Sequence, residues 1–100
     1  MLVADLDIEE TISALLKRTQ SLGIRPIRSR ILRHPNRDPG CLNGAAAMLR
    51  PYSQRSSRAL VVFDRDGCGH RSGSREDIER EVETSLTRNG WNDDDVAAIV

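Results

Sequence analysis

Four apolar segments with strand-like patterns alternate with three amphipathic ones along this chain. The strand-like segments cover residues 2–4, 27–33, 59–63 and 95–100. Between them, apolar residues recur every three or four positions, as on one face of a helix, over residues 8–22, 42–52 and 75–89. The order strand, helix, strand, helix, strand, helix, strand predicts an α/β fold: a mainly parallel sheet with helices on both faces.

Capping and turn residues set the expected boundaries of these helices. Asp7 fits the start of the first helix, and Gly23 fits its end. The segment HPNRDPG, residues 34–40, is rich in turn formers and predicts a loop before the second helix. Ser74 matches a capping box at the start of the third helix, and Gly90 matches its glycine-type end.

Length and composition favour one small domain. The chain has 100 residues, and its last apolar segment has no helix after it. We therefore expect residues 1–100 to be the N-terminal portion of a longer, truncated protein. The chain has no apolar run long enough to span a bilayer and no basic leader, so we expect a cytoplasmic protein without a membrane partner.

Positive charge is concentrated in the middle of the chain. Residues 17–58 hold ten basic residues and one acid, although the net charge of the whole chain is zero. Arg28, Arg30 and Arg33, in the second predicted strand, are candidate contacts for a nucleic-acid backbone. The alternative is that they form the charged side of an edge strand, where charge discourages aggregation.

Two aspartates follow the most apolar segment and suggest a metal site. Asp64 and Asp66 come directly after the strand predicted at 59–63, and Asp5 follows the first strand. If these strands are parallel, the three carboxylates share the edge of the sheet where ligands bind. Carboxylate oxygens suit Mg²⁺, which can activate water and neutralise a phosphoryl oxygen. The alternative is an ordinary turn, because the sequence DRDG favours one.

These residues resemble the Toprim-like domain. Its members have an acidic residue after the first strand, matched here by LVADLD at 2–7, and an Asp-x-Asp pair after a later central strand, matched by LVVFDRD at 60–66. Leu15–Leu16 lies where such domains carry a Leu-Leu pair in the first helix. The texts DPGC at 38–41 and NGW at 89–91 are similar to a group of uncharacterised bacterial Toprim-like proteins.

The resemblance implies a function as well as a fold. It implies Mg²⁺-dependent phosphoryl transfer or nuclease activity on nucleic acid, in a class with members in anti-phage defence. Asp64 and Asp66 would hold the metal, and Asp5 would be a third ligand or the catalytic base. Toprim domains usually carry Glu-Gly after the first strand, where this chain has Ala4-Asp5. That departure leaves a second hypothesis open, a non-catalytic interaction subunit that binds other protein subunits.

Two further patterns in the sequence suggest other kinds of site. The stretch from Phe63 to Gly67 is similar to the first motif of haloacid dehalogenase-like phosphatases, with Asp64 as nucleophile and Asp66 as acid/base. That motif normally follows the first strand, and no lysine follows it here, although the family needs one. A zinc site is the other pattern, but its spacing is not a standard one. Its ligands would be His34, Cys41, Cys68 and His70.

Overall fold

The computed structural model describes residues 1–18, 23, 29–54, 58–69 and 73–100. Within these residues, four parallel strands in the order β2-β1-β3-β4 alternate with three helices, which confirms the predicted α/β fold. The elements are β1 (Leu2–Val3), α1 (Leu6–Lys17), β2 (Leu32–Arg33), α2 (Arg37–Leu49), η1 (Arg50–Tyr52), β3 (Ala59–Val62), α3 (Arg75–Arg88), η2 (Asp93–Asp95) and β4 (Val96–Ile99). None of the helices in this described part is long and apolar enough to cross a membrane.

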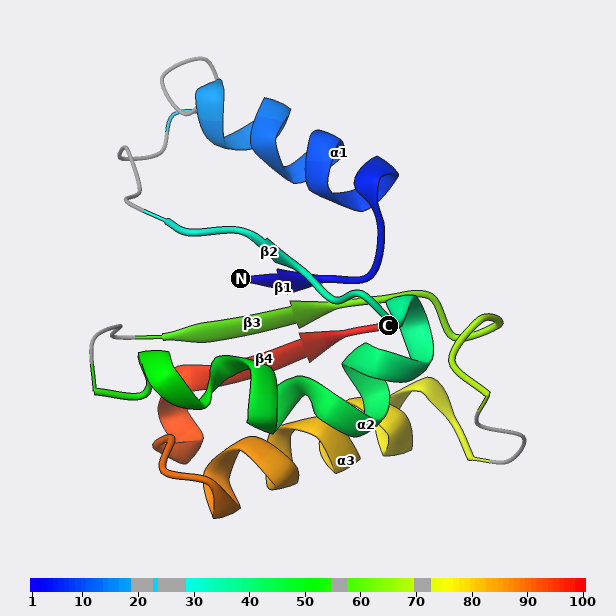
Figure 1. Ribbon diagram of the computed structural model, residues 1–100, viewed down its shortest axis with the longest axis vertical. Helices are drawn as coiled ribbons and strands as arrows, with labels where there is room; N and C mark the ends of the chain where they lie inside the picture. Colours follow the sequence, from blue (N-terminus) through cyan, green and yellow to red (C-terminus); the bar gives the residue numbers. More distant parts are fainter. Residues whose placement is uncertain (19–22, 24–28, 55–57, 70–72) are drawn as a thin grey trace.

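The order of the strands shows that the path of the chain across the sheet reverses its direction between β1 and β3. From β1 the chain moves to β2 on one side, and from β2 it crosses back over β1 to β3 and then to β4. Because such crossovers are right-handed, a reversal of direction moves the connecting helix to the other face of the sheet. Figure 1 shows this result, with α1 on one face and α2 and α3 together on the other.

The main core lies between the sheet and the pair α2–α3. Leu2 of β1 and Val61 of β3 are opposite each other in the sheet, and both side chains are fully buried on this face. Helix α3 contributes three residues at four-residue spacing, as its sequence pattern predicts: Ile78, Val82 and Leu86, each fully buried. Burying a side chain of this size contributes about 1.5–3 kcal/mol, so this face carries most of the apolar stabilisation.

The opposite face of the sheet is covered only in part. Val3 is fully buried beneath α1, but it stands apart from the main core cluster. Further along this face, Leu60 and Val62 of β3 are half-buried, and Ala97 and Ile99 of β4 are exposed. β3 is therefore central in the sheet, but only one of its faces is fully buried.

Helix α1 begins and ends earlier than the sequence predicts. Its N-cap is Asp5 rather than Asp7, because Asp5 has the extended backbone of a cap and accepts a hydrogen bond from the Ile8 N–H. The helix ends at Lys17 instead of continuing toward Gly23, and residues 19–22 lie outside the described part. The Asp5 side chain thus stabilises the start of α1 directly.

Helix α2 begins within the segment predicted to be a loop. It starts at Arg37, so Asp38, Pro39 and Gly40 form its first turn. Proline is acceptable there because the first-turn N–H groups of a helix have no intrahelical partner. Turn-forming composition alone therefore hid a helix start, and this prediction is wrong.

Helix α3 has the boundaries that its sequence indicates. Ser74 accepts a hydrogen bond from the Asp77 N–H, and Asp77 accepts one from the Ser74 N–H, which completes the predicted capping box. At the other end, Gly90 has a φ of 105° and the Trp91 N–H donates to the Leu86 carbonyl. This is the glycine-based ending expected for a helix followed by a buried apolar residue.

Strand β2 is shorter than predicted. The described strand covers only Leu32–Arg33, whereas the sequence indicated residues 27–33. Residues 24–28 lie outside the described part, and 29–31 are not strand. Because β2 is the first strand in the sheet order of the described residues, it is an edge strand in this part of the chain.

Candidate functional site at the carboxyl edge of the sheet

Two aspartates from separate segments lie at the carboxyl edge of the sheet, between β1 and β3, where the chain connections on either side leave in opposite directions. Strands β1 and β3 are parallel neighbours, with Val3 opposite Val62. Asp5 and Asp64 each lie two residues beyond that pair, so both are at the carboxyl edge. In open α/β sheets this position, between strands whose connections leave in opposite directions, is where ligands bind. The topology therefore places these acidic residues at the edge where open α/β sheets bind ligands.

Asp5 at this edge has a structural task. Its Oδ1 accepts a hydrogen bond of 2.9 Å from the Ile8 N–H, as the N-cap of α1. The side chain is half-buried. A carboxylate has two oxygens and about four acceptor positions, so this bond uses only part of its capacity.

Asp38 joins the same region, although sequence reasoning did not select it. It lies in the first turn of α2, and its Oδ1 accepts a hydrogen bond of 2.8 Å from the Asp64 N–H. Gly67 packs against the same carboxylate so closely that a Cβ there would overlap it. The available signal was topological: Asp38 follows β2, just as Asp5 follows β1 and Asp64 follows β3.

Asp64 and Asp66 form the turn that the alternative interpretation of DRDG expects. The Asp66 N–H donates to Asp64 Oδ1 at 3.2 Å, and both residues are exposed. Between them, Arg65 Nη2 donates to the Gly73 carbonyl at 2.8 Å. A turn and a ligand site are compatible, because both aspartates keep oxygens that solvent or a cation can reach.

The pKa of Cys41 shows that the carboxylates at this edge make the local electrostatic potential negative. Its thiol is fully buried on α2. The pKa of Cys41 is raised to about 12, mainly because its thiol is buried and in smaller part because of the negative charges of Asp38 and Asp5. Two carboxylates from different elements thus act on one buried group, which indicates a negative potential beside the start of α2.

The described residues do not form a complete metal cage. Among them, no group of three or more His, Cys, Asp or Glu side chains is arranged to hold a metal ion. For the zinc pattern, Cys41 and Cys68 are buried free thiols, and His34 Nδ1 accepts a hydrogen bond from the Asn36 N–H. His70 lies outside the described part of the chain.

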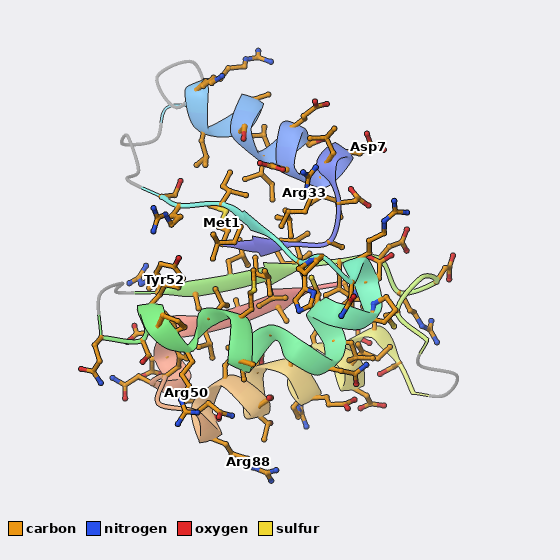
Figure 2. All side chains as sticks on the ribbon, in the orientation of Figure 1. Met1, Asp7, Arg33, Arg50, Tyr52 and Arg88 are labelled. Atoms are coloured by element: carbon orange, nitrogen blue, oxygen red, sulfur yellow. The ribbon has the colours of Figure 1, made fainter. Side chains whose placement is uncertain are left out.

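The three arginines selected from the sequence have separate surroundings. Arg33 lies between β2 and α1 (Figure 2), and its guanidinium is 3.8 Å from the Glu9 carboxylate. Arg30 lies over the ring of Tyr52, with its guanidinium carbon 5.6 Å from the ring centroid. Arg28 lies outside the described residues. Arg30 and Arg33 are both exposed on or beside an edge strand, a position that suits either contacts with a nucleic-acid backbone or a charged edge that discourages aggregation.

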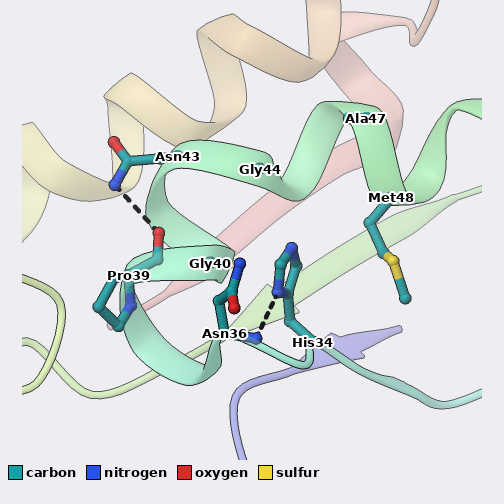
Figure 3. Close-up of a pocket in the computed structure, with 8 residues that line it drawn as sticks. All are labelled: His34, Asn36, Pro39, Gly40, Asn43, Gly44, Ala47 and Met48. Carbon is teal, nitrogen blue, oxygen red and sulfur yellow. Dashed lines mark hydrogen bonds between the residues drawn. The ribbon is translucent and has the colours of Figure 1, made fainter.

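A hollow of about 650 Å³ lies beside α2, on the β2 side. Figure 3 shows the His34 ring lying against the glycine side of α2, where a Cβ on Gly40 would overlap the imidazole. The dashed bonds join Asn36 to His34 and Asn43 to the Pro39 carbonyl. The lining contains no Asp, Glu, Lys or Arg and consists of His34, Asn36, Pro39, Gly40, Asn43, Gly44, Ala47 and Met48.

Comparisons of the chain with models of protein families, with curated proteins and with solved structures found no match. The chain is therefore placed by its architecture: it is a small α/β domain with a four-stranded parallel sheet.

Proposed function

We propose that this domain is Toprim-like and that it binds Mg²⁺ for phosphoryl transfer on nucleic acid. The observation that carries the proposal is the position of Asp5 and Asp64 at the carboxyl ends of two adjacent parallel strands, where the sheet reverses direction. The order of elements and the Asp-x-Asp pair after a central strand also agree with the Toprim resemblance.

The donor set suits magnesium better than zinc. Mg²⁺ prefers oxygen ligands, keeps several waters and is commonly held by one or two carboxylates together with substrate phosphates. Asp64 and Asp66 are exposed and would supply those carboxylates. The bound ion would supply charge neutralisation at a phosphoryl oxygen.

The chain's own residues would orient this site. Asp38 holds the Asp64 backbone and thereby fixes the turn that presents both aspartates. Asp5 would act as a proton acceptor or an additional ligand through the oxygen that does not cap α1. Arg30 and Arg33 are the described candidates for contacts with a phosphate backbone.

The experiment is calorimetric titration with Mg²⁺ and Mn²⁺. The Asp64→Asn variant should lose the heat of binding, because it removes a charged ligand at the proposed site. Asp94→Asn is the matched control, since Asp94 is exposed and precedes β4, at the other edge of the sheet. Unchanged heat in Asp64→Asn, or an equal loss in Asp94→Asn, would remove the metal site from the proposal.

A second candidate is a non-catalytic interaction subunit. It is favoured by the N-cap bond of Asp5, because this bond gives the residue at the proposed catalytic position a structural role that does not depend on catalysis. Mixing the domain with Mg²⁺ and labelled single- and double-stranded DNA separates the two functions. Cleavage that Asp5→Asn abolishes supports the enzyme, and a domain that binds Mg²⁺ but never cleaves supports the interaction subunit.

A further inference from the structure

The outer edge of β4 has an unusual arrangement of backbone donors. β4 is the last strand in the sheet order, so β3 is its only neighbouring strand in the described part of the chain. The Ile99 carbonyl accepts a hydrogen bond of 3.1 Å from the Phe63 N–H, on the β3 side. Backbone groups alternate sides along a strand, so the N–H groups of Ala98 and Val100 point away from β3. These outward donors would normally be open to solvent or to another strand.

Two glutamates of α3 accept hydrogen bonds from these outward N–H groups. The Ala98 N–H donates to Glu83 Oε1, and the Val100 N–H donates to Glu79 Oε2, each at 3.1 Å. The spacing explains the match. Four residues of helix rise about 6 Å, and two residues of strand advance about 6.6 Å, so residues four apart on α3 can reach donors two apart on β4. Both glutamates are half-buried, unlike the exposed acids nearby on α3.

The side chains of β4 make this edge attractive to another strand. Ile99 is 53% exposed, and Ala97 is also exposed on the open face of the sheet. An edge strand with exposed apolar side chains and unpaired backbone groups is a site for strand addition. Charged groups that block such an edge are a known means of keeping a sheet from extending.

We propose that Glu79 and Glu83 guard β4 against pairing with a second copy of this chain. When the two carboxylates are absent, β4 of one molecule pairs with β4 of another about a two-fold axis. Such pairing is self-complementary, because the same edge is used by both copies. It joins two four-stranded sheets and places the Ile99 side chains of both copies on one continuous apolar face. This role is independent of any chemistry at the carboxyl edge of β1 and β3.

The first test is self-association, measured by sedimentation velocity over a range of concentrations. The double variant Glu79→Ala/Glu83→Ala should form dimers or larger species at concentrations where the native chain is monomeric. The matched control is Glu10→Ala/Glu76→Ala, which removes the same charge from two exposed helical glutamates. Adding Ile99→Lys to the Glu79→Ala/Glu83→Ala variant should restore the monomer, because a charge on an edge strand opposes pairing.

The hydrogen bonds are tested apart from the charge. Glu79→Gln/Glu83→Gln keeps a carbonyl acceptor at each position and should remain monomeric. Association of this variant to the same extent as the alanine pair would overturn the proposal. The proposal would also be overturned if Glu79→Ala/Glu83→Ala stayed monomeric, or if the control Glu10→Ala/Glu76→Ala associated to the same extent.

A further readout stays informative if the double variant does not fold. In the native chain the Ala98 amide should exchange slowly with deuterium, although it lies on the outer edge. The single variant Glu83→Ala should speed that exchange by about tenfold while leaving Val100 little changed. Equal exchange rates at Ala98 in the two proteins would show that Glu83 does not hold this edge, and the proposal would fall.

Discussion

Gly67 and Asp38 should be energetically coupled, because the missing side chain of one leaves room for the carboxylate of the other. A Cβ built at Gly67 would overlap Asp38 Oδ2 and lie 3.0 Å from Asp38 Cγ. Gly67→Ala therefore forces the Asp38 carboxylate to rotate away. That movement breaks the 2.8 Å bond between Asp38 Oδ1 and the Asp64 N–H. The turn carrying the two candidate metal ligands then loses its attachment to α2.

The expected magnitude follows from two opposing effects. A hydrogen bond to a charged group contributes about 1.5–3 kcal/mol, and this one is exposed, so we expect a loss of about 1–1.5 kcal/mol. Gly67 lacks the positive φ of Gly69 and Gly73, so alanine is compatible with its backbone. Replacing glycine at such a position stabilises a protein by about 0.4–1 kcal/mol through the unfolded state. The net effect of Gly67→Ala in the native chain is a small destabilisation.

The test is a double-mutant cycle measured by urea denaturation. In an Asp38→Ala background the overlap is absent, so Gly67→Ala should change sign and stabilise the protein by about 0.4–1 kcal/mol. The coupling free energy between the two positions should be about 1–1.5 kcal/mol. Gly69→Ala is the contrasting variant, since its φ is 84° and nothing lies near its Cβ, so its cost should not depend on Asp38. Additivity of Gly67→Ala and Asp38→Ala within about 0.3 kcal/mol would refute the reasoning.

Three other predictions concern stability. Leu86→Ala should lower the free energy of unfolding by about 2–5 kcal/mol, because the Leu86 side chain is fully buried. Leu15 is 49% exposed, so Leu15→Ala should lower it much less. Equal losses in the two variants would contradict the described core. Ser74→Ala should cost about 1 kcal/mol by removing the capping box of α3, and an unchanged urea midpoint would argue against that cap. The raised pKa of Cys41 means that its thiol form stabilises the fold fully below pH 9.0 and that this contribution is lost as pH rises toward about 12. Urea denaturation across that range should show a decline that is smaller in Cys41→Ala, and identical declines in the two proteins would contradict it.

Much of the fold is determined by local sequence patterns. Strand and helix periods give the order of elements and the parallel sheet, because a strand–helix–strand connection of this length favours parallel strands. The capping box at Ser74 and the glycine ending at Gly90 are equally local, since every group involved lies within a few residues. These are the features that the sequence predicts correctly.

The tertiary structure decided the features that depend on packing between distant segments. Asp5 became a cap, and α2 began at Arg37 within a segment of turn formers, because helix ends depend on how the chain enters the packed layers. Asp38 reaches Asp64 because α2, which connects β2 to β3, packs across β1 and β3, an arrangement that no local pattern encodes. The same holds for the guarded edge of β4, where Glu83 lies 15 residues before the amide that it binds. Periodicity shows which side of a strand or helix is apolar, but only the assembled sheet shows which neighbour each side meets.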